Sequence, residues 1–296
     1  MLSPYRPGVT LAIRAHTPPH PFGRHYSNED TIRQTIPGLK AEDRVDRLDF
    51  ALSNPPLKTP PPAQGTSHVL TLLKKMEHRQ ERSSGAHVVS CDLDSDKSCR
   101  YVAKIYDGVD YPLVDYRGFD YMYLADQDYS CEAAAYQSIP EHLQGSTVPR
   151  YFGSWTCSVE TGIPGRHRSA RLILLEHVDG ECMLDMILHA KGVTRASGDI
   201  TAPVNYQLLP PEPKRLDVLA KIIEAEIELF QAGIVHRDVA PRNVIISCSP
   251  MRIALIDFNL ARVHKHYESG RKYLASRDPM RCPHRLSSAT GIARYL

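Results

Sequence analysis

Three polar side chains in the second half of the chain have the types and the spacing for acid–base and metal chemistry. Asp238 and Asn243 lie five residues apart after an apolar run, and Asp257 ends the next apolar run. A carboxylate can accept a proton from a hydroxyl group, and carboxylate and amide oxygens are ligands that Mg²⁺ prefers. The stretch from Asp238 to Asp257 has the length of a hairpin, with strands at 243–246 and 252–256. We therefore predict a tight loop and a hairpin that together position these side chains.

The residues around these positions carry a resemblance to a known superfamily. The His-Arg-Asp triplet at 236–238, the Asn five residues after its Asp, and the Asp-Phe pair that begins at Asp257 resemble the catalytic loop and metal-binding strand of the protein-kinase superfamily. The resemblance implies that Asp238 accepts the proton of an acceptor hydroxyl, that Asn243 and Asp257 bind Mg²⁺, and that ATP is the phosphate donor. It also implies that His236 is a packed, structural residue.

This loop departs from the usual protein-kinase sequence in two places. Ala240 stands where many kinases have a lysine, and Arg242, four residues after Asp238, takes a position typical of tyrosine kinases. The resemblance implies that Arg242 neutralises the transferring γ-phosphate. Asn259 replaces the glycine that follows Asp-Phe, and because Asn tolerates positive φ we expect metal binding by Asp257 to survive.

A lysine on a predicted strand is the candidate phosphate ligand. Residues 100–106 resemble the Val-Ala-x-Lys strand of kinases with one residue fewer between Ala and Lys, which implies that Lys104 reaches the α- and β-phosphates. Glu132, in an Ala-rich helical segment at residues 129–139, is the expected partner of Lys104. The stretch of chain between Lys104 and Glu132 is long for this pairing. We assign the excess to a loop with four tyrosines that pack against the sheet, Tyr111, Tyr116, Tyr121 and Tyr123.

Two further segments resemble the adenine and phosphate contacts of kinases. The strand at residues 171–180 ends in Glu-x-Val-x-Gly before a helix, as in the kinase hinge, which implies that backbone groups of Glu176 and Val178 bind the adenine edge. The glycine-rich loop is poorly matched, because Gly85 stands where kinases carry three glycines. We therefore expect Gly85 to be an ordinary turn residue and the loop to hold phosphate weakly.

These motifs together predict an α+β, two-lobed protein-kinase-like fold. We expect an N-lobe at residues 66–178, with an antiparallel β-sheet and one helix, and a mainly α C-lobe at residues 179–296 with the catalytic loop. Only the short segment 263–296 follows Arg262, so the C-lobe is shortened relative to protein kinases. The clearest helix is predicted at residues 215–231 by an apolar stripe of Leu216, Leu219, Ile223, Ile227 and Phe230.

Residues 1–65, called the N-terminal arm below, are predicted to be disordered. Eleven of the chain's 23 prolines lie there, and periodic apolar patterning is poor. A short helix between Glu42 and Leu52 is the exception that we expect. The proline runs also suit SH3 or WW domains as ligands, but we favour a solvated linker because such runs are common in disordered chains.

Composition limits the compartment and the partners. The net charge is +2, with 36 Lys and Arg against 34 Asp and Glu, so neither nucleic acid nor an anionic membrane is indicated as a partner. The seven cysteines are odd in number and form no Cys-x-x-Cys pair, which favours reduced thiols in the cytoplasm or nucleus. No apolar run reaches the ~18 residues of a membrane span. Arg6, Arg14 and Arg24 precede the first acid, as in transit peptides, but prolines interrupt this segment, so mitochondrial import is the lesser alternative.

Three functions stay open from the sequence. An ATP-dependent phosphotransferase acting on a protein hydroxyl is preferred by a narrow margin over one acting on a small molecule. Aminoglycoside- and choline-type kinases share the fold and carry His-x-Asp-x-x-Pro-x-Asn, a pattern that Pro241 completes. A pseudokinase that binds ATP without turnover fits the poor glycine loop and the short C-lobe. Because competent residues fill all the polar catalytic positions, we expect an enzyme.

Overall fold

The computed structural model describes residues 3–23, 26, 32, 39, 46–76, 85–111, 118–195, 202–248 and 250–266. The chain forms two compact units, the first from residues 1–134 and 151–177 and the second from residues 135–150 and 178–296. The division falls between His177 and Val178, one residue before the boundary expected from the sequence. Residues 135–150, which the sequence placed with the N-lobe, belong to the second unit.

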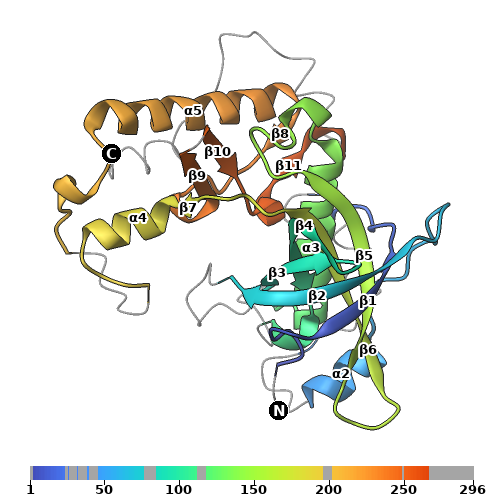
Figure 1. The fold of residues 1–296 in the computed structure, drawn as a ribbon. Helices are drawn as coiled ribbons and strands as arrows, with labels where there is room; N and C mark the ends of the chain where they lie inside the picture. The colour runs from blue at the N-terminus through green and yellow to red at the C-terminus, as the bar shows by residue number, and fades with distance from the viewer. Residues whose placement is uncertain are drawn as a thin grey trace. The chain divides into compact units, whose positions relative to one another are not determined.

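The first unit is built on a closed barrel of antiparallel strands in the order β1-β2-β3-β4-β6-β5 (Figure 1). Side chains alternate between the inside and the outside along β1, as the pleat of a strand requires. Ile13, Leu70, Ile105 and Leu172 are among the fully buried residues of the core. The strands are β1 (Thr10–Ala15), β2 (Ser67–Lys75), β3 (His87–Leu93), β4 (Asp96–Tyr106), β5 (Tyr151–Glu160) and β6 (His167–Glu176).

Strand β1 lies in the N-terminal arm, so the prediction of a disordered arm is wrong for the described part of this segment. β1 pairs with β2 from Thr10↔Thr71 onward and with β5 as far as Ala15↔Trp155, and it thereby closes the barrel. The prolines of the arm flank this strand and do not interrupt it, so its ladder hydrogen bonds are intact. Composition had suggested disorder because the strand has only six residues among many prolines.

The rest of the described arm is also folded. Helix α2 (Arg47–Ser53) begins at Asp46, whose side chain accepts a hydrogen bond from the backbone nitrogen of Asp49 at 2.9 Å. The predicted short helix is therefore present but starts later, and residues 40–45 lie outside the described residues, as do residues 24–25, 27–31 and 33–38 of the arm. Two elements complete the first unit, the 3₁₀ turn η1 (Gly108–Asp110) and helix α3 (Tyr121–Ser138), whose last residues count with the second unit.

The second unit combines helices with two small sheets of strand order β10-β9-β7 and β11-β8. The predicted hairpin is present, with Val244 opposite Leu255 and Cys248 opposite Met251. The helices are α4 (Met183–Ala190) and α5 (Glu212–Gln231), and the strands are β7 (Glu181–Cys182), β8 (Ile234–Val235), β9 (Val244–Cys248), β10 (Met251–Leu255) and β11 (Arg262–Val263). The 3₁₀ turns are η2 (Glu141–Leu143), η3 (Tyr206–Leu208), η4 (Pro241–Asn243), η5 (Phe258–Leu260) and η6 (His264–His266).

Helix α5 was predicted correctly, but its buried face was not. Leu216 and Ile227 of the predicted stripe are 55% and 47% exposed. The buried row lies beside the predicted stripe on the helix surface and consists of Val218, Ile222, Ala225 and Leu229. Two apolar rows lie side by side on this helix, and the row with the small Ala225 faces the core.

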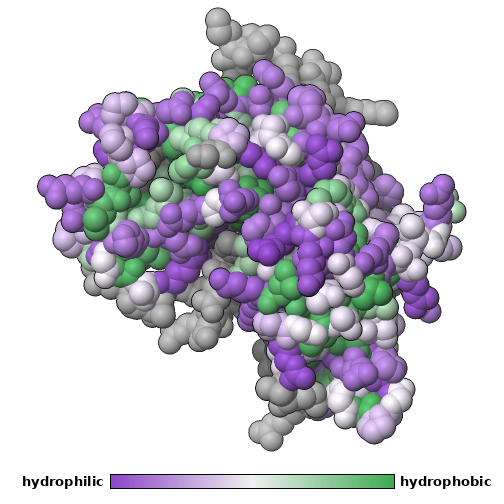
Figure 2. All heavy atoms as spheres, viewed as in Figure 1, coloured by the Kyte–Doolittle hydropathy of each residue, from purple (hydrophilic) through white to green (hydrophobic). Residues whose placement is uncertain are grey.

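The two units reproduce the predicted α+β organisation, with an antiparallel sheet and one long helix in one unit and helices with small sheets in the other. The prediction of a shortened C-lobe concerns residues 267–296, which lie outside the described residues. Polar and apolar side chains are intermixed over the face drawn in Figure 2. Within the described ranges, no helix has the length and apolarity to cross a membrane. The six described cysteines are all free thiols.

Candidate active site

The loop that follows β8 is held by a buried histidine. His236 lies between the loop and the end of β10, with Nε2 at 2.9 Å from the carbonyl oxygen of Ile256. Its Nδ1 accepts a hydrogen bond from the backbone nitrogen of Asp238 at 3.3 Å, and its ring packs on Phe258. Burial lowers the pKa of His236, so the ring is neutral at pH 7, which this pairing of one donor and one acceptor requires. The packed role that the resemblance implied fits this geometry.

The carboxylate of Asp238 is held on both oxygens by residues of its own loop. Arg242 donates to Oδ1 at 2.5 Å, and Nδ2 of Asn243 donates to Oδ2 at 2.9 Å. Nδ2 of Asn243 also donates to the carbonyl oxygen of Asp238 at 2.8 Å. The turn η4 provides this arrangement, because Pro241 begins it and presets its φ. The structure thus brings together Asp238, Arg242 and Asn243, as their spacing indicated.

The β9–β10 hairpin brings the backbone of Asn243 close to the chain just before Asp257. The backbone nitrogen of Ile256 donates to the carbonyl oxygen of Asn243 at 3.0 Å, so Asn243 stands one residue from Asp257 in the ladder. Because the amide nitrogen of Asn243 is directed at Asp238, the oxygen of the same amide is available to a cation. An amide oxygen and a carboxylate are both ligand types that suit Mg²⁺, which takes one or two protein oxygens together with substrate phosphates. These residues therefore fit the expected metal.

The backbone around these residues is locally strained. Arg237 and Asp257 have φ of 68° and 67°, in the left-handed region that non-glycine residues rarely occupy. Positive φ was expected at Asn259 from the sequence, but Asn259 lies within η5 and is not among the residues with positive φ. That interpretation is wrong, because the turn after β10 is made at Asp257 itself. Strained residues of this kind cluster at functional sites, where packing holds a side chain in a fixed direction.

A second polar cluster lies in the first unit and contains the predicted lysine–glutamate pair. Lys104 extends from β4, between β3 and β6, and its Nζ contacts Oε2 of Glu132 on α3. Both side chains are buried. The described part of the long stretch between them includes η1 and the part of α3 that precedes Glu132. The region predicted as a tyrosine-rich loop is partly this helix. Its tyrosines 111, 121 and 123 are buried, as expected, and residue 116 lies outside the described residues.

Tyr106 belongs to this cluster and was not singled out from the sequence. Its hydroxyl donates to Oε2 of Glu132 at 2.7 Å, the same oxygen that Lys104 contacts. Burial, and then the charge of Glu132, raise the pKa of Tyr106 well above its usual value, so the phenol remains a donor. The signal in the sequence was its position two residues after Lys104, since alternate residues of a strand share a face.

The segment that resembles a hinge follows the end of β6. Glu176 is the last residue of β6 and lies opposite Tyr101, and the next backbone nitrogen, of His177, donates to the carbonyl oxygen of Arg100. Val178 begins the second unit and is buried with Ile245, Ala254 and Ile256. No described contact tests an adenine role for these backbone groups, which stays a prediction.

Gly180 is needed at the end of the hinge segment because the chain passes close to β9. A Cβ atom at this position would lie 2.6 Å from the carbonyl oxygen of Ile246, closer than real Cβ contacts come. The hydroxyl of Ser247 also donates to the carbonyl oxygen of Asp179. The described part of the phosphate loop is limited to Gly85, since residues 77–84 lie outside the described residues.

Sequence comparisons relate the chain to phosphotransferases. A sequence model of the phosphotransferase enzyme family, APH, matches residues 83–265. The chain is similar to the serine/threonine-protein kinase PknB of Mycobacterium tuberculosis (strain ATCC 25618 / H37Rv) and of Mycobacterium bovis, with 34% identity over 91 residues in each case. This match covers 30% of the chain but only 12% of each kinase. Among solved structures, the Cydia pomonella Granulovirus kinase PK-1 is similar with a TM-score of 0.39 and 15% identity, over 66% of this chain and 52% of that chain.

The family match spans more than half of the chain. It runs from the residues before β3 to η6, and it contains every residue that the sequence proposed for the site. The chain is therefore a kinase-like phosphotransferase, an enzyme that belongs to the phosphotransferase enzyme family within the protein-kinase-like superfamily.

Proposed function

We propose that this protein transfers the γ-phosphate of ATP to a hydroxyl group, with Asp238 as the general base. The observation that carries the proposal is the arrangement of the loop, where Asp238 is fixed by Arg242 and Asn243 while Asn243 pairs through its backbone with Ile256, the residue before Asp257. An oriented carboxylate next to two oxygen ligands for a cation is what phosphoryl transfer requires.

In the proposed reaction each residue has one task. Asp238 accepts the proton of the acceptor hydroxyl as the new oxygen–phosphorus bond forms and the bond between the γ-phosphorus and ADP breaks. Arg242 is 43% exposed at its side chain, so it can turn from Asp238 toward the charge that develops on the phosphate. Asn243 and Asp257 would hold Mg²⁺, which neutralises phosphate charge when it is bound. Lys104, oriented by Glu132, would contact the α- and β-phosphates, and backbone groups of Glu176 and Val178 the adenine.

For the acceptor we propose a small-molecule alcohol, with a protein hydroxyl as the second candidate. Pro241 completes the pattern typical of aminoglycoside- and choline-type kinases, and the family match covers more than half of the chain. The sequence alone had favoured a protein acceptor by a narrow margin. The similarity to a serine/threonine-protein kinase supports this second candidate, over a shorter part of the chain.

The test is a phosphate-transfer assay with γ-labelled ATP and panels of amino alcohols, aminoglycosides and generic protein acceptors. Asp238→Ala removes the proposed base, so turnover should fall by about 10²–10⁴ while ATP affinity holds. Asp238→Asn should fall as far, because an amide is not a base and its NH2 group would face one of the two donors, Arg242 or Asn243. Asp217→Asn, on the exposed face of α5, is the matched control and should keep full activity.

The metal role is tested separately through binding. Mg-ATP at about 100 times its Kd should stabilise the wild-type fold by about 2.7 kcal/mol, and Asp257→Asn should remove the Mg²⁺ dependence of this effect. Equal turnover of wild type and Asp238→Ala with every acceptor would contradict the catalytic assignment. If the wild type binds ATP but shows only background hydrolysis, the pseudokinase alternative is correct instead.

A further inference from the structure

Helix α3 is buried along almost its whole length although it is rich in polar residues. Every residue from Phe119 to Tyr136 is buried, including three aspartates, Gln127 and Glu132. A surface helix of a small unit normally buries one face and exposes the other. Buried polar groups are stable only when they have partners, so α3 must be contacted on more than the barrel side.

The N-terminal arm provides contacts to α3 at several positions. The backbone nitrogen of Leu57 donates to Oδ2 of Asp126 at 2.8 Å. Arg171 on β6 donates to the carbonyl oxygen of Leu57 at 3.2 Å. The thiol of Cys131, the residue directly before Glu132, is directed at the carbonyl oxygen of Phe22 at 3.6 Å. Two segments of the arm that are far apart in the sequence, around Phe22 and around Leu57, thus contact the same helix.

A histidine of the arm reaches the helical turn that precedes Glu132. Nδ1 of His16 lies 2.7 Å from the hydroxyl of Tyr129, and its Nε2 lies 3.1 Å from the hydroxyl of Thr59. Burial lowers the pKa of His16 to about 4, so the ring is neutral and Nδ1 can accept from Tyr129. The ring of Tyr129 in turn packs 5.5 Å from that of Tyr106, the phenol that donates to Glu132.

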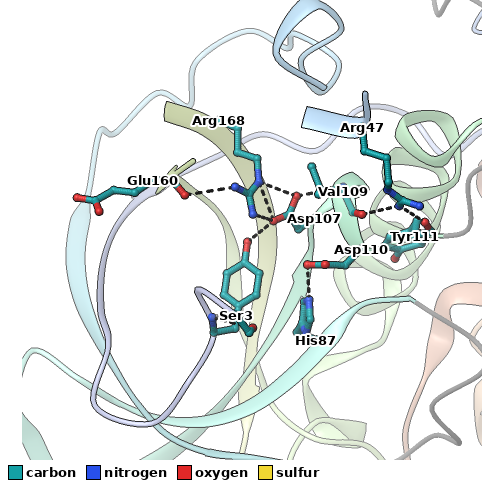
Figure 3. Close-up of polar contacts among 10 residues, drawn as sticks. Ser3, Arg47, His87, Asp107, Val109, Asp110, Tyr111, Glu160 and Arg168 are labelled. Carbon is teal, nitrogen blue, oxygen red and sulfur yellow. Dashed lines mark hydrogen bonds and ion pairs between the residues drawn. The ribbon is translucent and has the colours of Figure 1, made fainter. Parts of the chain in front are cut away.

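The arm also fixes the first part of the connection between β4 and α3, residues 107–111, as Figure 3 shows. The hydroxyl of Tyr5 donates to Asp107 at 2.7 Å, and Arg168 forms a buried ion pair with the same carboxylate at 2.6 Å. Arg47 donates to the carbonyl oxygens of Val109 and Tyr111. Asp107 is only three residues from Lys104, so the arm contacts the chain on both sides of the Lys104–Glu132 pair.

We propose that the N-terminal arm is a positioning element for phosphotransfer, and that it holds α3 and residues 107–111 so that Glu132 stays paired with Lys104. This inference rests on the proposed function, in which Lys104 contacts the phosphates of ATP. A hydrogen bond weakens steeply beyond its normal length, so a shift of α3 by about 1 Å is enough to disturb the pair. Because the arm acts through Glu132 in this proposal, its residues are positioning residues and not catalytic ones.

The chain offers a specific wedge between the arm and α3. Gly23 has φ of 64°, and a Cβ atom there would lie 1.7 Å from Nε2 of Gln127 on α3. Gly23→Ala must therefore displace the side chains of Gln127 and Tyr123, and because both are buried on α3 we expect the arm or the helix to shift with them. Gly8, also in the arm, has φ of 85°, but a Cβ atom there would meet nothing within 4 Å. Gly8→Ala is thus a matched control, with the same left-handed backbone penalty and no wedge.

Two measurements on the full chain test the proposal. Hydrogen exchange in α3 should increase in Gly23→Ala and stay at the wild-type rate in Gly8→Ala. The Kd for ATP should rise about tenfold in Gly23→Ala, the loss expected when one charge-assisted hydrogen bond is weakened, and stay unchanged in Gly8→Ala. Adding Gln127→Ala, which removes the amide that the added Cβ atom meets first, should bring both values back toward wild type, with the hydroxyl of Tyr123 at 2.8 Å as the remaining overlap. In a Glu132→Gln background the wedge should have no further effect on Kd.

Three results would overturn the inference. The first is an equal effect of Gly23→Ala and Gly8→Ala, and the second is a full effect of the wedge in the Glu132→Gln background, which would show that the arm acts elsewhere. If Gly23→Ala fails to fold, Phe22→Leu replaces it, because this change shortens a ring that packs on Tyr123 at 5.2 Å. The third contradicting result is then a Phe22→Leu variant with wild-type hydrogen exchange in α3 and a wild-type Kd for ATP. If the wild-type protein binds no ATP, the proposed function itself is wrong. The ATP titration of the wild type is done first and separates this outcome from a failure of the inference about the arm.

Discussion

The hydroxyl of Tyr106 provides a sharp test of how the buried pair in the first unit is held. Tyr106→Phe removes one oxygen atom and leaves the ring in place against Tyr129. The lost bond joins a phenol to a fully buried carboxylate at 2.7 Å. Hydrogen bonds to charged groups contribute about 1.5–3 kcal/mol, and the buried carboxylate of Glu132 cannot turn to water for a replacement. We therefore expect Tyr106→Phe to destabilise the protein by about 1.5–3 kcal/mol.

Thermal unfolding measures this loss directly. For a chain of this size each kcal/mol corresponds to roughly 2–4 °C, so the midpoint should fall by roughly 3–12 °C. Tyr111→Phe is the matched control, because it removes a buried hydroxyl whose contact with Asp128 is long, at 3.4 Å, and should cost much less. Since Glu132 orients Lys104, the Kd for ATP should also rise in Tyr106→Phe. Equal midpoints for the two variants, or an unchanged midpoint for Tyr106→Phe, would refute the reasoning.

Further predictions concern other parts of the fold. Gly180→Ala should destabilise the second unit by about 1–3 kcal/mol in denaturant titrations, because its Cβ atom would overlap the carbonyl oxygen of Ile246, whereas Gly65→Ala, with open space around it, should be neutral. Burial raises the pKa of Asp126 to about 6, so the folded state holds its proton more tightly than the unfolded state and stability falls as pH rises from about 4 to 6. Asp126→Asn should therefore raise the unfolding midpoint at pH 8, and the gain should disappear near pH 4; a gain that grows toward acid pH would contradict this. Deleting residues 1–20 should prevent soluble expression, because it removes β1 and leaves the edges of two strands unpaired, while recovery of a folded, soluble fragment would show that the arm is dispensable.

The catalytic loop could be predicted from the sequence because its contacts are local. Arg242 and Asn243 lie four and five residues from Asp238, and they contact its carboxylate directly. The hairpin that brings Asp257 to Asn243 is also short. Where residue types, spacing and partners all lie within about 20 residues, the sequence carries most of the geometry. One local feature was predicted wrongly: positive φ was expected at Asn259 but occurs at Asp257. The position of such a residue depends on the path of the chain and not on residue type alone.

The parts that could not be predicted depend on distant partners. Tyr106 is an ordinary strand tyrosine until α3 brings Glu132, from another element, against it. In the sequence the aspartates of α3 resemble loop or surface residues. The partner of Asp126 is the backbone of Leu57, which is distant in the sequence and could not be identified from nearby residues. The residues near β1 in the sequence have a composition that favours disorder. Residues 10–15 are ordered because they pair with strands far along the chain.

The closure of the barrel by β1 has a consequence for the order in which the chain folds during synthesis. Thr10 pairs with Thr71 and Ala15 with Trp155, so one partner strand follows well after β1 and the other lies beyond the middle of the chain. β1 leaves the ribosome before both of its partner strands and waits longest for β5, although domains generally fold from the N-terminus onward. Until Cys157 has emerged from the ribosome, Leu11 and Ile13 lack the part of the barrel core that β5 contributes. Contacts of such long range make folding slow, so the newly made arm has an extended period in which chaperones can bind it.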